Sequence, residues 1–154
     1  MNAAAIEAKL REFLSRNAEG EGIAAAYLFG SVARGTAAPG SDVDVGVLYE
    51  EDPPLTLEGL GLRLEGDLES LLGKPVQVVV LNEAVPELIV RIIREGRLLL
   101  DHDRSKRAQF EVASQNEFWD FEPNLRLYRD RNGIPDPSLE DLIQRYRQTR
   151  QERL

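Results

Sequence analysis

Apolar residues recur at two different spacings along this chain, and the change between the spacings predicts helices that alternate with strands. Runs that are continuously apolar, or that alternate apolar with polar residues, predict four strands, at residues 23–29, 42–49, 76–81 and 98–100. Apolar side chains three or four residues apart predict helices at residues 3–16 and 57–72. Pro86 and Gly96 delimit a further helix between the last two strands.

Polar residues with glycine or proline separate these segments. Residues 17–22 and 35–40 are predicted to be loops, and Ser31–Arg34 a single helical turn between the first two strands. Pro53 and Pro54 break the chain before a stripe of leucines at helical spacing. We interpret that stripe as a face toward the core rather than as a cofactor or dimer contact; it consists of Leu57, Leu60, Leu64, Leu68 and Leu71.

The last third of the chain, from about residue 104, is helical in composition. Pro123 predicts a break or a kink, residues 132–137 predict a loop, and Ser138–Asp141 resembles a capping box that starts a final helix. We interpret Trp119 and its neighbours Phe118 and Phe121 as a buried cluster, with a partner-binding face as the alternative. The final helix is interpreted as solvated, with a docking arm as the alternative; its arginines are Arg145, Arg147, Arg150 and Arg153.

Strands that alternate with helices favour an α/β (α+β) fold, with a short mixed β-sheet flanked by helices and a helical C-terminal portion. The chain of 154 residues has the length of one domain. We divide it into a core at residues 1–103 and a helical C-terminal extension at residues 104–154, packed on the same domain.

Composition narrows the classes of function. The chain has no cysteine, which excludes disulfides and thiolate metal sites, and it shows no signal peptide and no apolar run long enough to span a membrane, so we expect a cytoplasmic protein. The net charge of −8 disfavours direct binding of nucleic acids. That charge lies within residues 42–70, beside a pair of aspartates, where a divalent cation could offset part of it.

The candidate chemistry lies between residues 30 and 44. Gly30 and Ser31 close the first strand and offer backbone N–H groups and a hydroxyl to a phosphate, and Arg34 can neutralise phosphate charge. Asp42 and Asp44 project from one face of the second strand, because side chains alternate along a strand. Two such carboxylates can hold Mg²⁺ together with substrate phosphates, and two bridged ions can stabilise an in-line displacement.

The order Gly30-Ser31, ten residues, Asp42-x-Asp44 resembles the hallmark of the DNA polymerase β-like nucleotidyltransferase superfamily. The fuller pattern, from Gly-Ser-x-Ala-Arg-Gly to Ser41-Asp-x-Asp, is similar to the minimal nucleotidyltransferases (MNT). Residues 76–82 and 92–100 continue the likeness, and the tail at residues 116–123 looks like the MntA-type antitoxins. The likeness covers most of residues 23 to about 130.

The resemblance implies a nucleotidyltransferase fold and a protein that works beside a HEPN-domain toxin, an enzyme that cleaves RNA. Antitoxins of this kind transfer AMP from ATP to a tyrosine of the toxin. By this analogy Asp42 and Asp44 are the catalytic and metal-binding residues for Mg²⁺. The nucleotide would be bound by Gly30 and Ser31 with help from Arg34, and Ser41 belongs to the same motif.

One position departs from the superfamily pattern. A third carboxylate usually stands on the next core strand, and the matching residue here is Gln77, which cannot accept a proton and binds Mg²⁺ poorly. Glu50, Glu51 or Glu83 could replace it, although none lies at the matching strand position. The alternative is a protein that binds its partner without modifying it.

Three functions therefore stay open: a Mg-dependent adenylyltransferase that silences a HEPN toxin, an antitoxin that acts by binding alone, and a nucleotidyltransferase with a small-molecule acceptor. Arg97 and His102 match the spacing of an RNA-cleaving HEPN motif, but the residues between them predict a strand where that motif needs a helix. A single histidine gives no zinc site and no Ser-His-Asp hydrolase, and no P-loop is present.

Overall fold

The computed structural model describes residues 1–54 and 61–152. The elements follow in the order α1 Ala3–Glu21, β1 Ile23–Phe29, α2 Gly30–Arg34, β2 Val43–Tyr49, α3 Leu62–Leu72, β3 Val76–Val80, the 3₁₀ turn η1 Leu81–Glu83, α4 Pro86–Glu95, β4 Arg97–Asp101, α5 Arg104–Asn132 and α6 Leu139–Glu152. Among these residues no helix is both long and apolar enough to cross a bilayer.

The four strands form one mixed sheet in the order β3-β2-β1-β4. β1 is antiparallel to both β2 and β4, whereas β2 and β3 run parallel. β1 is buried along its whole length, which agrees with its uninterrupted apolar sequence. The predicted α/β class and the mixed sheet are confirmed.

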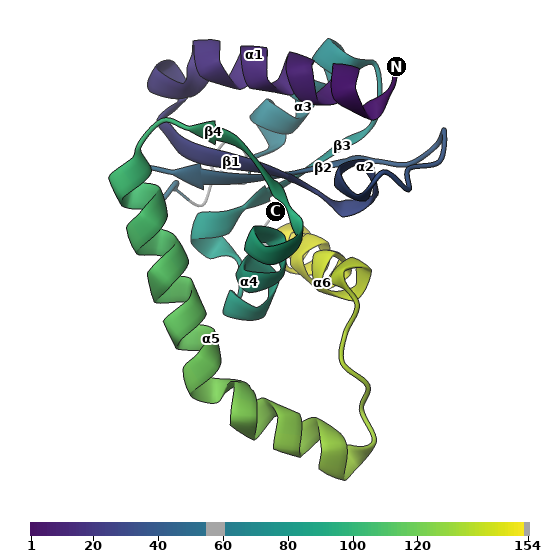
Figure 1. Ribbon diagram of the computed structural model, residues 1–154, viewed down its shortest axis with the longest axis vertical. Coiled ribbons are helices and arrows are strands. Elements are labelled where there is room, and N and C mark those ends of the chain that lie inside the picture. The colour runs from purple at the N-terminus through teal and green to yellow at the C-terminus, as the bar shows by residue number, and fades with distance from the viewer. Residues whose placement is uncertain (55–60, 153–154) are drawn as a thin grey trace.

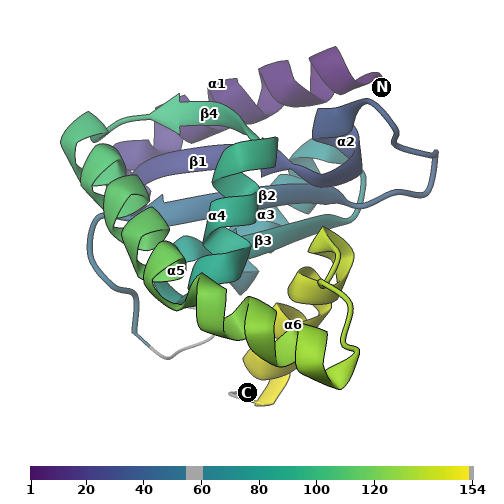
Figure 2. The same cartoon turned by 60° about the horizontal axis from the view of Figure 1, so that its bottom comes forward.

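Helices cover both faces of this sheet (Figures 1 and 2). One apolar cluster joins α1 and α3 to the sheet face formed by Val43, Val45 and Val47. A second cluster lies on the opposite face, where α4 and α6 pack against Leu48 and Val79. Because side chains alternate along β2, the residues between its valines point toward α4 and α6, and Asp44 is one of them.

Several predicted boundaries are corrected by the structure. α1 continues through the predicted loop at residues 17–22, because the apolar stripe extends to the buried Ala18 and the helix ends only at Gly22, in the left-handed conformation. Leu64 and Leu68 of α3 are buried, as the stripe predicts, and Leu71 is partly buried against the same cluster; Leu72, which the stripe does not include, is buried as well. Leu57 and Leu60 lie outside the described residues. α5 runs through Pro123 without a break, and Figure 1 shows that it bends along its length.

The outer edge of β3 is covered by side chains rather than by another strand. The backbone N–H groups of Val76 and Val78 donate to Glu69 and Glu65 of α3, at 3.2 and 2.9 Å. The N–H of Val80 donates to the Tyr146 hydroxyl of α6, at 2.9 Å. These bonds satisfy an edge that would otherwise expose unpaired backbone groups, and they fix α6 beside β3.

α6 starts as the capping box predicts: Ser138 Oγ accepts from the Asp141 N–H at 3.1 Å, and Asp141 accepts from the Ser138 N–H at 3.0 Å.

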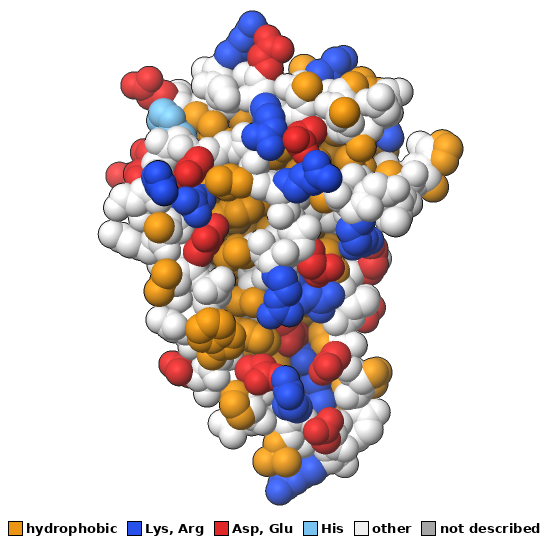
Figure 3. Space-filling view, viewed as in Figure 1, with side chains coloured by type: hydrophobic (Ala, Val, Ile, Leu, Met, Phe, Trp, Pro, Cys, Tyr) orange, Lys and Arg blue, Asp and Glu red, His pale blue; other side chains and the backbone are white. Residues whose placement is uncertain are grey.

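The interpretation of Trp119 as part of a buried cluster is wrong, because this side chain is 60% exposed on α5. Phe118 and Phe121 contact each other edge to face, and Phe121 is also exposed. Figure 3 shows hydrophobic side chains among charged ones along this side of the molecule.

Candidate active site

A cavity of about 360 Å³ opens where α2, the start of β2 and α6 meet. Its walls include Ser31 of α2, Asp42 and Asp44 of the second strand region, and Glu140 and Arg147 of α6. The first three come from the predicted motif. The two residues of α6 are separated from that motif by about a hundred positions in the sequence, and only the fold brings them together.

Gly30 places the Asp44 carboxylate in this cavity. The β1–β2 register sets Phe29 opposite Asp44, so the carboxylate lies directly against the first residue after β1. Gly30 has a φ of 77°, and a Cβ atom built there would overlap the Asp44 side chain. Glycine is therefore required twice, for its left-handed backbone and for the space that Asp44 fills.

Burial, and to a smaller extent the nearby Glu140 and Asp42 carboxylates, raises the pKa of the Asp44 carboxyl to about 7. Arg147 and Arg34 oppose this shift by favouring the charged form. A cation bound at the carboxylate would act in the same direction as these arginines. The strand therefore holds an acid whose ionisation near neutral pH responds to positive charge in the cavity.

Asp42 is paired with the C-terminal helix. Its Oδ2 atom lies 3.1 Å from Nη2 of Arg147, and the Arg147 Nε–H donates to Oε1 of Gln77. Gln77 is buried and sits opposite Asp44 in the β2–β3 register. The residue that matches the superfamily's third carboxylate is thus an amide that accepts from an arginine.

Of the other predicted nucleotide-binding residues, Ser31 and Ser41 line the same cavity, whereas Arg34 lines a separate cavity beside α1 and meets this one only through Glu140. Ser31 stands in the first turn of α2, and Ser41 lines the cavity while its Oγ accepts from the Ala38 N–H at 2.9 Å, which holds the preceding turn. Arg34 lies 3.9 Å from Glu140 in an exposed ion pair. Their contacts with a nucleotide remain predictions.

The carboxylates proposed to replace Gln77 lie elsewhere. Glu50 and Glu51 follow the far end of β2, where they border a different cavity with Tyr49, and Glu83 belongs to η1, which follows the far end of β3. Among the described residues, the acidic side chains of segment 42–70 are therefore not all gathered beside Asp42 and Asp44: Glu50, Glu51 and Asp52 lie past the far end of β2, and Glu65 and Glu69 of α3 bond to the edge of β3. Glu140, which borders the cavity, was not singled out from the sequence, where it reads as a first-turn residue of a solvated helix.

Asp42 and Asp44 fit a magnesium ion that completes its coordination with phosphate oxygens and water, since Mg²⁺ is usually held by one or two carboxylates. Within residues 1–54 and 61–152 no group of three or more acidic, histidine or cysteine side chains could hold a metal alone. The donor set thus favours a metal that arrives with its nucleotide.

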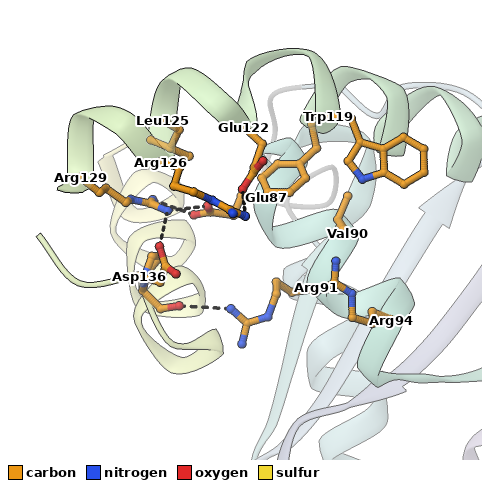
Figure 4. A pocket seen from close by; sticks show the side chains of 12 residues that line it. Glu87, Val90, Arg91, Arg94, Trp119, Glu122, Leu125, Arg126, Arg129 and Asp136 are labelled. Atoms are coloured by element: carbon orange, nitrogen blue, oxygen red, sulfur yellow. Dashed lines mark hydrogen bonds and ion pairs between the residues drawn. The ribbon is translucent and has the colours of Figure 1, made fainter. Parts of the chain in front are cut away.

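A second cavity, of about 290 Å³, lies between α4 and α5 and is bordered by the exposed Trp119 (Figure 4). Several of its charges are already paired: Arg129 holds Glu87 at 2.9 Å, and Arg91 donates to the Pro137 carbonyl at 3.1 Å. Arg94 stands beside Val90 and Trp119 in Figure 4. This cavity lacks the paired aspartates on which the predicted chemistry depends.

The chain matches the family model described as polymerase beta, nucleotidyltransferase, over residues 8–105. It is 36% identical over 97 residues to a Methanocaldococcus jannaschii protein provisionally named a protein adenylyltransferase, a match that covers 62% of this chain and 96% of the relative. Residues 8–105, which match the family model, hold all four strands and both aspartates.

Solved structures show the same fold. A toxin–antitoxin structure with AMP-PNP is 25% identical, with a TM-score of 0.67 over 80% of this chain and 95% of the other. A Shewanella oneidensis structure of an MNT antitoxin with a tri-AMPylated HEPN toxin is 19% identical, with a TM-score of 0.63 over 80% and 96% of the two chains. Since the family model matches well over half of the chain, this protein belongs to the polymerase beta nucleotidyltransferase family and is a nucleotidyltransferase of the MNT kind.

Proposed function

We propose that the protein is a Mg-dependent adenylyltransferase that transfers AMP from ATP to a tyrosine hydroxyl of a HEPN-domain toxin and thereby acts as its antitoxin. The observation that carries this proposal is the cavity in which Ser31, Asp42 and Asp44 converge. These three residues lie within residues 8–105, which match the nucleotidyltransferase family model, and a relative of the chain is named as a protein adenylyltransferase.

In the proposed reaction the acceptor oxygen bonds to the α-phosphorus of ATP, and the bond from that phosphorus to the α,β-bridging oxygen breaks to release pyrophosphate. Magnesium, when bound, would offset the negative charge that develops on the phosphate oxygens during the transfer. The chain's own part is to hold the ion at Asp42 and Asp44, to bind phosphate at Ser31, and to receive the proton of the hydroxyl. Gln77 cannot take that proton, and we assign this role to Glu140, the carboxylate of α6 that borders the cavity.

A protein acceptor is supported by two further observations. The neighbour solved with AMP-PNP and the AMPylated Shewanella complex are both toxin–antitoxin assemblies. In addition, α5 exposes large side chains such as Trp119 and Tyr128, each 60% exposed, which suits a surface that contacts a protein. The third reading, a small-molecule acceptor, has no comparable support on this chain.

Gln77 favours one alternative, an antitoxin that acts by binding alone. The buried amide stands where a carboxylate would assist, and it already accepts from Arg147. Under this alternative the cavity would be a remnant, and neutralisation of the toxin would not need ATP.

The two functions are separated by labelled ATP. The chain is incubated with Mg²⁺, a HEPN-domain toxin encoded beside it, and ATP labelled at either the α- or the γ-phosphate. Transfer of α label alone to the toxin, lost in Asp44→Asn but kept in the exposed control Asp120→Asn, is the expected result. If Asp44→Asn still protects cells from the toxin and no label is transferred by the wild type, binding alone is the function.

A further inference from the structure

Arg147 brings a permanent positive charge into the nucleotide cavity from outside the family segment. Its guanidinium contacts Asp42 at 3.1 Å and also donates to the side chain of Gln77. Arg147 and Asp42 are 37% and 40% exposed, so the pair forms part of the open cavity wall and is not sealed in the core. A ligand in the cavity would meet this guanidinium directly.

α6 holds the arginine in place on both sides. Tyr146, one position earlier, accepts from the Val80 N–H at 2.9 Å. Arg150, one turn later, is paired with Glu65 at 3.0 Å and is largely buried. Because these anchors join α6 to β3 and α3, the guanidinium is positioned before any ligand binds, which is the arrangement that gives an arginine the most binding energy per bond.

The charge of the site is consistent with one divalent ion rather than two. On the sheet side of the cavity Asp42 and Asp44 supply two carboxylates and Gln77 supplies none, and Arg147 already occupies one Asp42 oxygen. The third carboxylate of the cavity wall, Glu140 of α6, is paired with Arg34. A second divalent ion between Asp42 and the Gln77 position would lie beside a guanidinium, where like charges repel. An amide at residue 77 is the side chain that suits this arrangement, because it can accept from the arginine without adding negative charge.

We propose that Arg147, held by Gln77, is the fixed cation of the nucleotide site: it takes the place of a second divalent ion and binds the phosphates of the nucleotide. The proposal rests on the function proposed above, and it assigns the C-terminal helix to the active site. Guanidinium groups suit this role because they stay charged and can bind phosphate through two parallel N–H donors.

The first test counts metal ions without any turnover. Bound Mn²⁺ is measured by paramagnetic resonance in the presence of saturating AMP-PNP, for the full-length wild type and for the double variant Gln77→Asp/Arg147→Gln. We expect one Mn²⁺ per chain in the wild type and two in the double variant. Two ions in the wild type would overturn the inference and leave the proposed function intact, whereas a wild type that binds no AMP-PNP would overturn both.

The second test separates a phosphate contact from a structural tie. Calorimetry with AMP-PNP and Mg²⁺ should show that Arg147→Gln weakens binding by at least about tenfold, the usual effect of losing a charge-assisted hydrogen bond. Arg147→Lys, which keeps the charge, should bind more tightly than Arg147→Gln but less tightly than the wild type. The control Arg145→Gln, which removes an exposed charge from the same helix, should bind with wild-type affinity. If Arg147→Gln binds AMP-PNP with unchanged affinity, the arginine only anchors α6 to the sheet and the inference is wrong. If Arg147→Gln binds Mn²⁺ more tightly than the wild type in the absence of nucleotide, the arginine competes with the metal for Asp42, and the inference is also wrong.

Discussion

Asp44 couples the protonation of the site to the stability of the fold. Its pKa is raised to about 7, from an ordinary value of 3.8, chiefly because the carboxyl is buried. Between these two values the folded chain keeps a proton that the unfolded chain has released. This contribution to stability is complete below about pH 4 and is lost as the pH rises through 7.

We therefore predict that Asp44→Asn stabilises the ligand-free protein, and more so at pH 8 than at pH 5, by a difference on the order of 2 kcal/mol. Urea unfolding of both proteins at the two pH values measures it, with the exposed Asp120→Asn as the matched control. Affinity for Mg²⁺ with AMP-PNP should fall in the wild type below pH 7, since the metal needs the ionised carboxylate. Equal effects of Asp44→Asn at both pH values would contradict the raised pKa.

Gly30 is the residue at which the site constrains the backbone, because its φ is positive and the Asp44 carboxylate fills the space beside it. We predict that Gly30→Ala costs about 1–3 kcal/mol of unfolding free energy, because the new methyl group meets both a positive φ and the Asp44 carboxylate. It should also abolish binding of AMP-PNP with Mg²⁺, because Asp44 must swing out of the cavity.

Gly20→Ala is the control for this change. Gly20 lies inside α1 with open space around its Cα, so alanine there should stabilise the protein by about 0.5–1 kcal/mol and leave nucleotide binding unchanged. Urea unfolding and calorimetry on the two variants give both readouts. A Gly30→Ala variant that binds nucleotide normally would show that Asp44 is not held as described.

Among the secondary-structure elements, the contact between α6 and β3 positions the part of the site that lies on the C-terminal helix. We predict that Tyr146→Phe lowers the unfolding free energy by about 1–2 kcal/mol, because the Val80 N–H at the sheet edge loses its acceptor. Tyr128→Phe, at a side chain that is 60% exposed on α5, should change it by less than about 0.5 kcal/mol. Equal stabilities of the two variants in urea would mean that water replaces the Tyr146 hydroxyl without cost.

The elements themselves are largely predictable from the sequence, because their signals are local. β1 matches its apolar run at both ends, and α4 matches the limits set by Pro86 and Gly96. α1 is longer than its sequence predicts, because polar residues and Gly20 indicate a loop at residues 17–22, whereas only Gly22 ends the helix. Trp119 was assigned to a core because an aromatic residue gives no local sign of which side of a long helix meets the protein.

The part of the candidate site that lies on consecutive elements could be predicted from the sequence, whereas the part that lies on α6 could not. The motif places Gly30, Ser31, Asp42 and Asp44 together because β1, α2 and β2 are consecutive and the β1–β2 register sets Phe29 opposite Asp44. Gln77 is identified through the resemblance, because it matches the position of the superfamily's third carboxylate on the next core strand. Glu140 and Arg147 carry no motif, and their place in the cavity depends on how α5 and its following loop return the chain to β3, which no local pattern encodes.

At the scale of the molecule, the family segment and the helical extension share one apolar cluster. Leu139, Leu142 and Ile143 of α6 pack with Leu88 and Ile92 of α4. The extension is also joined to the sheet through α5, where the buried Tyr27 hydroxyl donates to Glu111 at 2.6 Å. The M. jannaschii relative is matched over 96% of its length within 97 residues, so its matched sequence has no counterpart of the whole extension.

We therefore propose that residues 1–103 and the helical extension unfold as a single cooperative unit in this protein. A chain cut after residue 103 leaves the α4 side of the sheet uncovered, and we predict that it binds a hydrophobic dye and unfolds without a cooperative transition in urea. A chain cut after Asn132 keeps α5 but loses α6. It should fold with reduced stability, bind the dye, and lose the Arg147-dependent part of its AMP-PNP affinity. Cooperative unfolding of the 1–103 chain with wild-type nucleotide affinity would show instead that the extension is an accessory to a self-sufficient site.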